Sequence, residues 1–183
     1  MRGEVKGKTS KYKYTQINYF DMHTHILPEV DDGSASEEES LNMMELAYRE
    51  GIRYICATPH YSVKKAVPKE KLVTAYNHLR CRMKENYPDM ELYLGNEILY
   101  SYDVIEHLEK GLASSYNGSC YVLIEFFPSE KYRYIYEAVQ AVRRAGYIPV
   151  IAHIERVKCL WKDWQKLDEL KNCAAVFQMN TGS

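Results

Sequence analysis

Six side chains of the types that bind metal ions recur along this chain, each at or just beyond a short apolar run. They are His23, His25, His60, Glu97, Glu125 and His153. The apolar runs are typical of strands, and in a barrel of parallel strands all the carboxyl ends meet on one rim. Five separate strands would have to carry a ligand at the same end by chance. We therefore interpret the set as a metal site.

Taken one at a time, these signals are weaker. The pair His23 and His25 directs two imidazoles to the same side, because side chains alternate along a strand. Glu125 lies inside an apolar run, and a buried carboxylate is costly unless it is paired or binds a metal. A single loop histidine such as His60 is ordinarily structural, and Asp31-Asp32-Gly33 fits ordinary turn chemistry. The joint placement carries the interpretation.

The ligand types also narrow the chemistry. Mixed imidazole and carboxylate donors suit zinc, manganese or iron and argue against a thiolate-rich structural site. A carboxylate such as Glu97 can bridge two ions, and clustered divalent ions can activate water and hold a phosphoryl group in line. Arg156 is either a bidentate phosphate clamp or a partner in a surface salt bridge. His78 and His107 fall in predicted helices, so we expect them to be surface or packing residues.

Several other functions are excluded or disfavoured. No cysteine is followed six positions later by arginine, and the chain has no P-loop, no G-x-G-x-x-G and no G-x-S-x-G motif. A formal net charge of -1 gives no electrostatic case for nucleic acid. No segment reaches the roughly 20 apolar residues of a membrane span, so we expect no membrane insertion. Five dispersed cysteines without a C-x-x-C pair indicate reduced thiols in the cytoplasm.

Strand-like and helix-like segments alternate, which predicts a parallel α/β fold. Strands are expected at residues 19–23, 52–57, 91–94, 121–126, 147–152 and 175–178. Helices are expected from Ser36 to about Gly51 and at residues 68–87, 102–110, 131–145 and 161–172. Ser36 and Glu39 form a capping box at the first helix. Residues 1–18 form a basic extension that we expect to be flexible, and residues 19–183 form the domain.

The chain resembles the PHP (polymerase and histidinol phosphatase) superfamily, and within it the manganese-dependent tyrosine phosphatases of bacterial capsule operons. The resemblance rests on segments 21–28 (DMHTHILP), 30–34 (VDDGS), 57–60 (ATPH), 95–98 (GNEI), 123–126 (LIEF) and 150–156 (VIAHIER). It implies a distorted TIM-like barrel of about seven strands. It also implies up to three metal ions at the strand ends, Mn²⁺ first and Zn²⁺, Fe²⁺ or Mg²⁺ as alternatives.

The resemblance further implies how the ligands are divided. One ion would take His23, His25 and Glu97, a second Asp32 and His60, and a third Glu97, Glu125 and His153. The aspartate and histidine that would complete the first two sites belong to an Asp-x-His motif near the family's C-terminus, and this chain ends before that motif. We therefore expect an incomplete barrel whose last βα segment is missing, in a gene fragment or a degenerate member. Such a chain would bind about one ion well and turn over poorly.

Our leading hypothesis is a metal-dependent phosphatase that removes phosphate from tyrosine on a bacterial kinase regulating capsule export. Arg156 would bind the phosphate. Two alternatives remain open: a fragment that binds metal or a partner without turnover, and a PHP phosphoesterase acting on small phosphate monoesters. Metal-dependent amidohydrolases also begin with His-x-His, but they typically use lysine or further histidines where this chain has Glu97 and Glu125.

Overall fold

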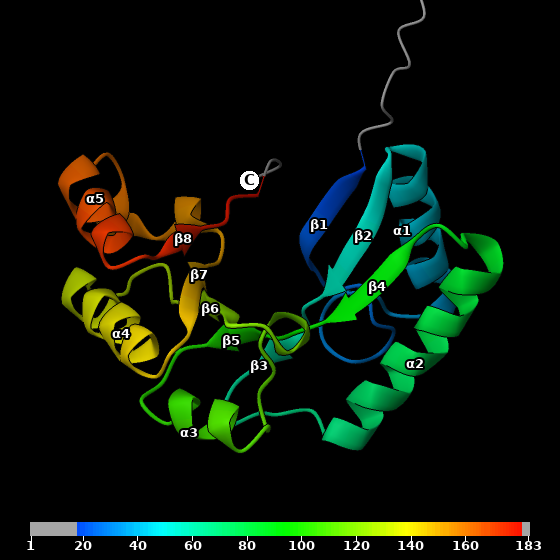
Figure 1. Cartoon of the computed structure of the whole chain (residues 1–183), viewed down its shortest axis with the longest axis horizontal. Coiled ribbons are helices and arrows are strands. Elements are labelled where there is room, and N and C mark those ends of the chain that lie inside the picture. The colour runs from blue at the N-terminus through cyan, green and yellow to red at the C-terminus, as the bar shows by residue number, and fades with distance from the viewer. Residues whose placement is uncertain (1–17, 181–183) are drawn as a thin grey trace, which may run out of the picture.

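The computed structural model describes residues 18–180, so the predicted basic extension lies outside the described residues except for Asn18. Eight strands form two sheets, in the orders β1-β2-β4 and β3-β5-β6-β7-β8, and every strand pair is parallel. Figure 1 shows the two sheets as successive parts of one arc, with helices on its outer side. The predicted parallel α/β architecture is confirmed.

The strands are β1 (Tyr19–Thr24), β2 (Ile52–Ala57), β3 (His60–Tyr61), β4 (Glu91–Leu94), β5 (Glu97–Leu99), β6 (Tyr121–Glu125), β7 (Ile148–Ile151) and β8 (Val176–Phe177). The helices are α1 (Glu37–Arg49), α2 (Lys69–Asn86), α3 (Val104–Glu109), α4 (Tyr132–Arg144) and α5 (Trp164–Asn172). The six strands expected from the sequence are all present, with bounds that agree to within one residue.

Two strands were not expected, and they contain two of the candidate ligands. His60 begins β3 and Glu97 begins β5, so each starts a short second strand instead of ending a long one. The strand conformation is interrupted between β2 and β3 and again between β4 and β5. Across these breaks the Gly95 N–H donates to Ala57 O at 2.9 Å, and the Glu97 N–H donates to Pro59 O at 3.1 Å. Strands of two or three residues are too short to show a period in the sequence.

The start of α5 also differs from the expectation. The sequence predicted a helix from residue 161, whereas α5 begins at Trp164. Residues Lys158–Leu160 form a 3₁₀ turn, and the Asp163 carboxylate then caps α5 by accepting a hydrogen bond from the Lys166 N–H at 3.2 Å. A good N-cap fixes where a helix starts, so the true start follows Asp163.

Two hydrophobic cores lie under the helices. Helices α1 and α2 cover the first sheet around buried residues such as Met44, Leu79 and Leu92, while α3, α4 and α5 cover the second around Ile124 and Val139. Ser36 caps α1 by accepting from the Glu39 N–H at 3.2 Å, and Glu39 accepts from the Ala35 N–H at 2.7 Å. The return bond of the capping box thus goes to Ala35 rather than to Ser36.

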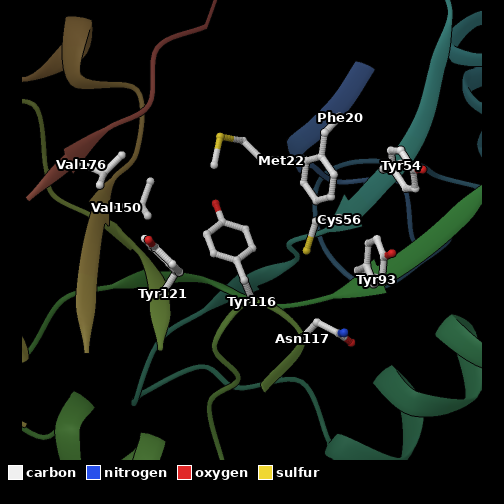
Figure 2. A pocket seen from close by; sticks show the side chains of 10 residues that line it. All are labelled: Phe20, Met22, Tyr54, Cys56, Tyr93, Tyr116, Asn117, Tyr121, Val150 and Val176. Carbon is white, nitrogen blue, oxygen red and sulfur yellow. The ribbon is translucent and has the colours of Figure 1, made fainter. Parts of the chain in front are cut away.

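The inner side of the arc holds an apolar cavity of about 560 Å³. Figure 2 shows Phe20 and Met22 of β1 on one side of it and Val150 and Val176 on the other, with the Tyr116 ring between them. The Tyr116 hydroxyl is buried and has no hydrogen-bond partner among the described residues. This lining offers packing surface and almost no polar chemistry, so the reactive residues lie elsewhere.

Candidate metal centre

Glu97 lies at the centre of the candidate site, and its side chain is only 1% exposed. Its Oε2 atom is 3.0 Å from the Nε2 atoms of both His23 and His25, and 3.3 Å from His60 Nδ1. Its Oε1 atom is 2.7 Å from His153 Nε2. One carboxylate therefore meets four imidazoles, which arrive from β1, from the residue just beyond β1, from β3 and from the loop after β7.

The other two predicted ligands surround this group. Asp32 Oδ1 lies 3.4 Å from His60 Nε2, and the Asp32 side chain is 82% exposed. Glu125 Oε2 lies 3.7 Å from His60 Nδ1, and Glu125 Oε1 lies 3.4 Å from His153 Nε2. All seven predicted metal ligands and Arg156 line one cavity of about 460 Å³. The structure thus brings every predicted site residue together.

The donor set fits divalent cations. Three groups of ligand atoms lie within 4.8 Å of one another: His23, His25 and Glu97; His25, Asp32 and His60; and His60, Glu97 and Glu125. An imidazole nitrogen that faces a carboxylate oxygen at about 3 Å needs either a proton or a cation between the two atoms. Imidazole and carboxylate donors bind Zn²⁺, Mn²⁺ and Fe²⁺ in proteins. The residues present therefore suit a metal cluster.

These groups agree in part with the division that the family resemblance implies. The first group is the expected one, and the second adds His25 to Asp32 and His60. In the third group His60, rather than His153, joins Glu97 and Glu125. His153 nevertheless points its Nε2 atom at both of these carboxylates. The metal roles of the individual side chains remain predictions.

Hydrogen bonds between the carboxylates and imidazoles of the site strongly shift their pKa values. Burial by itself would raise the pKa of Glu97, but the hydrogen bonds from His153, His23 and His25 outweigh burial and hold the pKa well below its usual range. Burial would lower the pKa of His25, yet its bonds to Asp31 and Glu97 raise that pKa to about 10. Burial would also lower the pKa of His153, but its hydrogen bonds to Glu125 and Glu97 raise that pKa to about 9.

Asp31 contacts the candidate site but was not among the residues predicted from the sequence, because it looked like ordinary turn chemistry. Its Oδ2 atom accepts from His25 Nδ1 at 2.6 Å and from the His60 N–H at 2.9 Å, and Oδ1 accepts from the Gly33 N–H at 3.1 Å. A carboxylate behind a ligating histidine fixes the ring and raises its basicity. Asp31 therefore orients His25, while its neighbour Asp32 faces the cavity.

Gln178 is the second residue that sequence reasoning missed. It follows β8, and its Oε1 atom lies 3.0 Å from His23 Nδ1 and 2.8 Å from the His153 backbone nitrogen. A glutamine after a short strand carries no sequence signal of this role, because its two partners lie 155 and 25 residues away.

Two features show how closely the backbone is fitted around the site. A Cβ atom at Gly33 would lie 2.2 Å from His25 O, so only glycine allows this approach. His153 has a φ of 31°, a left-handed conformation that is strained for a residue with a side chain. Its Nδ1 atom is buried without a hydrogen-bond partner among residues 18–180.

The two remaining histidines lie apart from the site, as expected. His78 on α2 is 54% exposed, and its Nε2 atom lies 3.1 Å from Glu37 Oε2. His107 on α3 forms a hydrogen bond with the Tyr61 hydroxyl through Nδ1. Neither histidine belongs to a candidate metal group in the described part of the chain.

Comparison with known proteins shows the family of this chain. The model of the capsular polysaccharide synthesis family CpsB/CapC matches residues 19–183. The chain belongs to the CpsB/CapC family. Membership of the PHP superfamily is consistent with this match.

Relatives in the CpsB/CapC family are named as tyrosine-protein phosphatases, and the chain is homologous to them. It is 37% identical over 164 residues to the tyrosine-protein phosphatase CpsB of Streptococcus pneumoniae. This match covers 88% of this chain and 67% of the relative. It is 36% identical over 165 residues to the tyrosine-protein phosphatase YwqE of Bacillus subtilis. This second match covers 89% of this chain and 65% of the relative. The chain thus spans about two thirds of the length of these relatives.

A solved structure of the CpsB/CapC family has the same fold. It comes from crystal structures of YwqE of Bacillus subtilis and CpsB of Streptococcus pneumoniae, described as metal-dependent tyrosine phosphatases. The match has a TM-score of 0.80 at 33% identity and covers 88% of this chain and 66% of the solved chain. Such enzymes are phosphoric monoester hydrolases.

Within the described residues, no helix has the length and apolar character needed to span a membrane.

Proposed function

We propose that this chain binds divalent cations at the Glu97 cluster and hydrolyses phosphotyrosine there, at the low rate expected from the sequence. The ligands are His23, His25, Asp32, His60, Glu97, Glu125 and His153, and Mn²⁺ is the ion we favour. The single observation that carries this proposal is the position of Glu97, whose two buried oxygens face four imidazole nitrogens at 2.7 to 3.3 Å. The mixed donor set is also the type that accepts Mn²⁺.

The side chains of the cavity divide the work. Divalent ions at such a site activate water and neutralise charge on the transferred phosphoryl group. Arg156 lines the same cavity, and its Nε atom forms an ion pair with Glu155 Oε1 at 3.9 Å, which is the alternative that the sequence left open for it. This distance is too long for a hydrogen bond and the side chain is 52% exposed, so the guanidinium can still bind two phosphoryl oxygens at once. Asp31 holds the ring of His25 in place while this happens.

The substrate we propose is a phosphotyrosyl protein, specifically the tyrosine kinase that controls capsule export, encountered in the cytoplasm. The family description, capsular polysaccharide synthesis, and the names of the relatives support a partner of this kind. The cavity, at about 460 Å³, has room for a phosphotyrosyl group, and Arg156 among its lining residues supplies a positive charge for the phosphate.

We further propose that the two sheets form an open arc of a distorted PHP barrel. Two observations support this reading. The chain passes directly from β2 to β3 and from β4 to β5, so the sheets continue one another. In the described residues β1 and β8 are outer strands, and a groove lined by residues 19–23 and 177–180 lies between them.

The test is phosphate release from a phosphotyrosyl peptide by the purified chain, with Mn²⁺ and after chelation. Release that depends on Mn²⁺ and is lost in Glu97→Gln supports the proposal. Arms with phosphoserine peptide and with small phosphate monoesters compare substrate classes. Metal binding without release from any substrate would overturn the catalytic part. Preference for a small monoester over the peptide would overturn the assignment of the substrate.

A further inference from the structure

The carboxamide of Gln178 bridges two candidate ligands, one from β1 and one from the loop after β7. Its Oε1 atom lies 3.0 Å from His23 Nδ1, on β1, and 2.8 Å from the backbone nitrogen of His153, after β7. Gln178 is 8% exposed. It is therefore a buried polar side chain whose one oxygen serves two site residues.

The backbone holds Gln178 firmly in this position. The Gln178 N–H donates to Ile151 O at 2.9 Å, and Gln178 O accepts from the Ile154 N–H at 2.9 Å. The far end of its side chain is fixed as well, because Nε2 donates to Asn180 Oδ1 at 2.8 Å. These bonds leave the carboxamide little freedom to rotate away from His23.

The bond from His153 determines which carboxamide atom faces His23. A backbone N–H can only donate, so the atom opposite the His153 N–H must be the carboxamide oxygen. The same oxygen is the neighbour of His23 Nδ1. Because that oxygen accepts and does not donate, His23 Nδ1 must carry a proton. When a metal ion lies between Nε2 and Glu97, which are 3.0 Å apart, the lone pair of the neutral ring is on Nε2 and faces that ion.

We propose that Gln178 is a positioning residue that fixes His23 as the Nδ1–H tautomer, with Nε2 directed at the metal centre. Asp31 does the same for His25, with a charged acceptor in place of a neutral one. In the His-x-His pair, the His23 imidazole thus faces a neutral carboxamide and the His25 imidazole faces a carboxylate. Supports of this kind typically change metal affinity by about 10- to 100-fold. The inference rests on the proposed metal function.

The test compares two substitutions at this position. Gln178→Glu keeps an oxygen acceptor for His23 and His153, whereas Gln178→Leu removes it at similar volume. We expect Gln178→Glu to bind Mn²⁺ at least as tightly as wild type and Gln178→Leu to bind it about 10- to 100-fold more weakly. Gln165→Leu is the matched control, because Gln165 lies on α5 and its side chain hydrogen-bonds only Glu169 among the described residues. Calorimetric titration gives the dissociation constants, and circular dichroism shows whether each variant is folded.

The second readout is the tautomer of His23, which a purely structural role of Gln178 would not change. Nitrogen-15 NMR of the metal-free and the Zn²⁺-loaded protein should show a protonated Nδ1 in wild type and in Gln178→Glu. In Gln178→Leu that proton should exchange rapidly or be lost. An unchanged His23 signal in Gln178→Leu, or equal affinity losses in the two variants, would overturn the inference. Failure of wild type to bind metal would instead overturn the proposed function, and the metal-free spectra would still decide the role of Gln178.

Discussion

Glu97 Oε1 lies 2.7 Å from His153 Nε2, although the two residues are 56 positions apart in the chain. Glu97 begins β5 and His153 follows β7, so this contact joins two strands that β6 separates in the sheet. Both side chains are almost fully buried. A buried carboxylate and imidazole at this distance stabilise the fold only while a proton or a cation lies between them.

Replacing Glu97 by glutamine tests that dependence. The amide keeps the shape of the side chain but removes the charge and directs N–H donors at the imidazoles. We expect Mn²⁺ affinity to fall by more than the roughly 100-fold that can follow loss of an outer support, and phosphatase activity to disappear. Isothermal titration measures the affinity. Glu106→Gln on the exposed face of α3 is the matched control and should bind Mn²⁺ normally.

Arg156 should affect substrate binding and leave metal binding unchanged. Arg156→Lys retains the positive charge but loses the planar pair of donors that suits a phosphoryl group. We expect kcat/KM for a phosphotyrosyl peptide to fall by about 10-fold or more, at an unchanged dissociation constant for Mn²⁺. Steady-state kinetics and metal titration on the same sample separate the two effects. Equal loss of both would place Arg156 among the supports of the metal site.

The pKa values of His25 and His153 predict an unusual pH dependence of stability in the metal-free protein. They are raised from 6.5 to about 10 and about 9. The folded state therefore holds these protons more tightly than the unfolded state does. The resulting stabilisation is fully present below about pH 6.5 and is lost as the pH rises through 9 to 10.

Melting temperatures measured in chelator at pH 6.5 and pH 9.5 check this sign, and we expect the lower value at pH 9.5. Metal affinity should change in the opposite direction, because bound metal must displace the same protons. Mn²⁺ should therefore bind more tightly as the pH rises from 6.5 toward 9. A metal-free protein that melts at the same temperature at both pH values would contradict these assignments.

Gly33 limits how the Asp31–Asp32 turn can pack. An added Cβ at this position would lie 2.2 Å from His25 O and 2.3 Å from His25 Cβ, so the turn would have to move. We expect Gly33→Ala to lower the melting temperature and to weaken Mn²⁺ binding, because the turn carries Asp31 and Asp32. Gly95→Ala is the comparison, since its nearest contact is 3.4 Å. Thermal denaturation with and without Mn²⁺ measures both effects, and normal binding by Gly33→Ala would show that the turn adapts.

Much of the site could be predicted from the sequence because its ligands lie next to strongly apolar runs. Residues 52–57 and 148–151 are recognisable as strands, and parallel strands place their ends on one rim. The order β1-β2-β4 and the separate second sheet could not be predicted. They depend on the interruptions of the strands after Ala57 and Leu94. Backbone hydrogen bonds join the neighbouring segments there, and no side-chain pattern in the sequence indicates them. Asp31 and Gln178 were missed because their partners become neighbours only in the folded chain.

The outer strands of the two sheets predict self-association. Phe20 on β1 is 51% exposed and Val176 on β8 is 41% exposed, and unpaired parallel edges tend to pair with other chains. We expect the 183-residue chain to form dimers or larger species at micromolar concentrations. Val176→Lys should shift it toward monomer, while Leu46→Lys on α1 should not. Sedimentation velocity measures this, and a wild-type chain that stays monomeric would show that the edges are protected.

The most direct test of the central claim is anomalous diffraction at the manganese edge from crystals grown with Mn²⁺. Ligand bonds at such centres are about 2.0 to 2.2 Å long. The account predicts at least one anomalous peak within bonding distance of Glu97, together with imidazole nitrogens from His23, His25, His60 or His153. An empty Glu97 cluster in crystals that hold Mn²⁺ at another place, or in crystals soaked at saturating Mn²⁺, would contradict it.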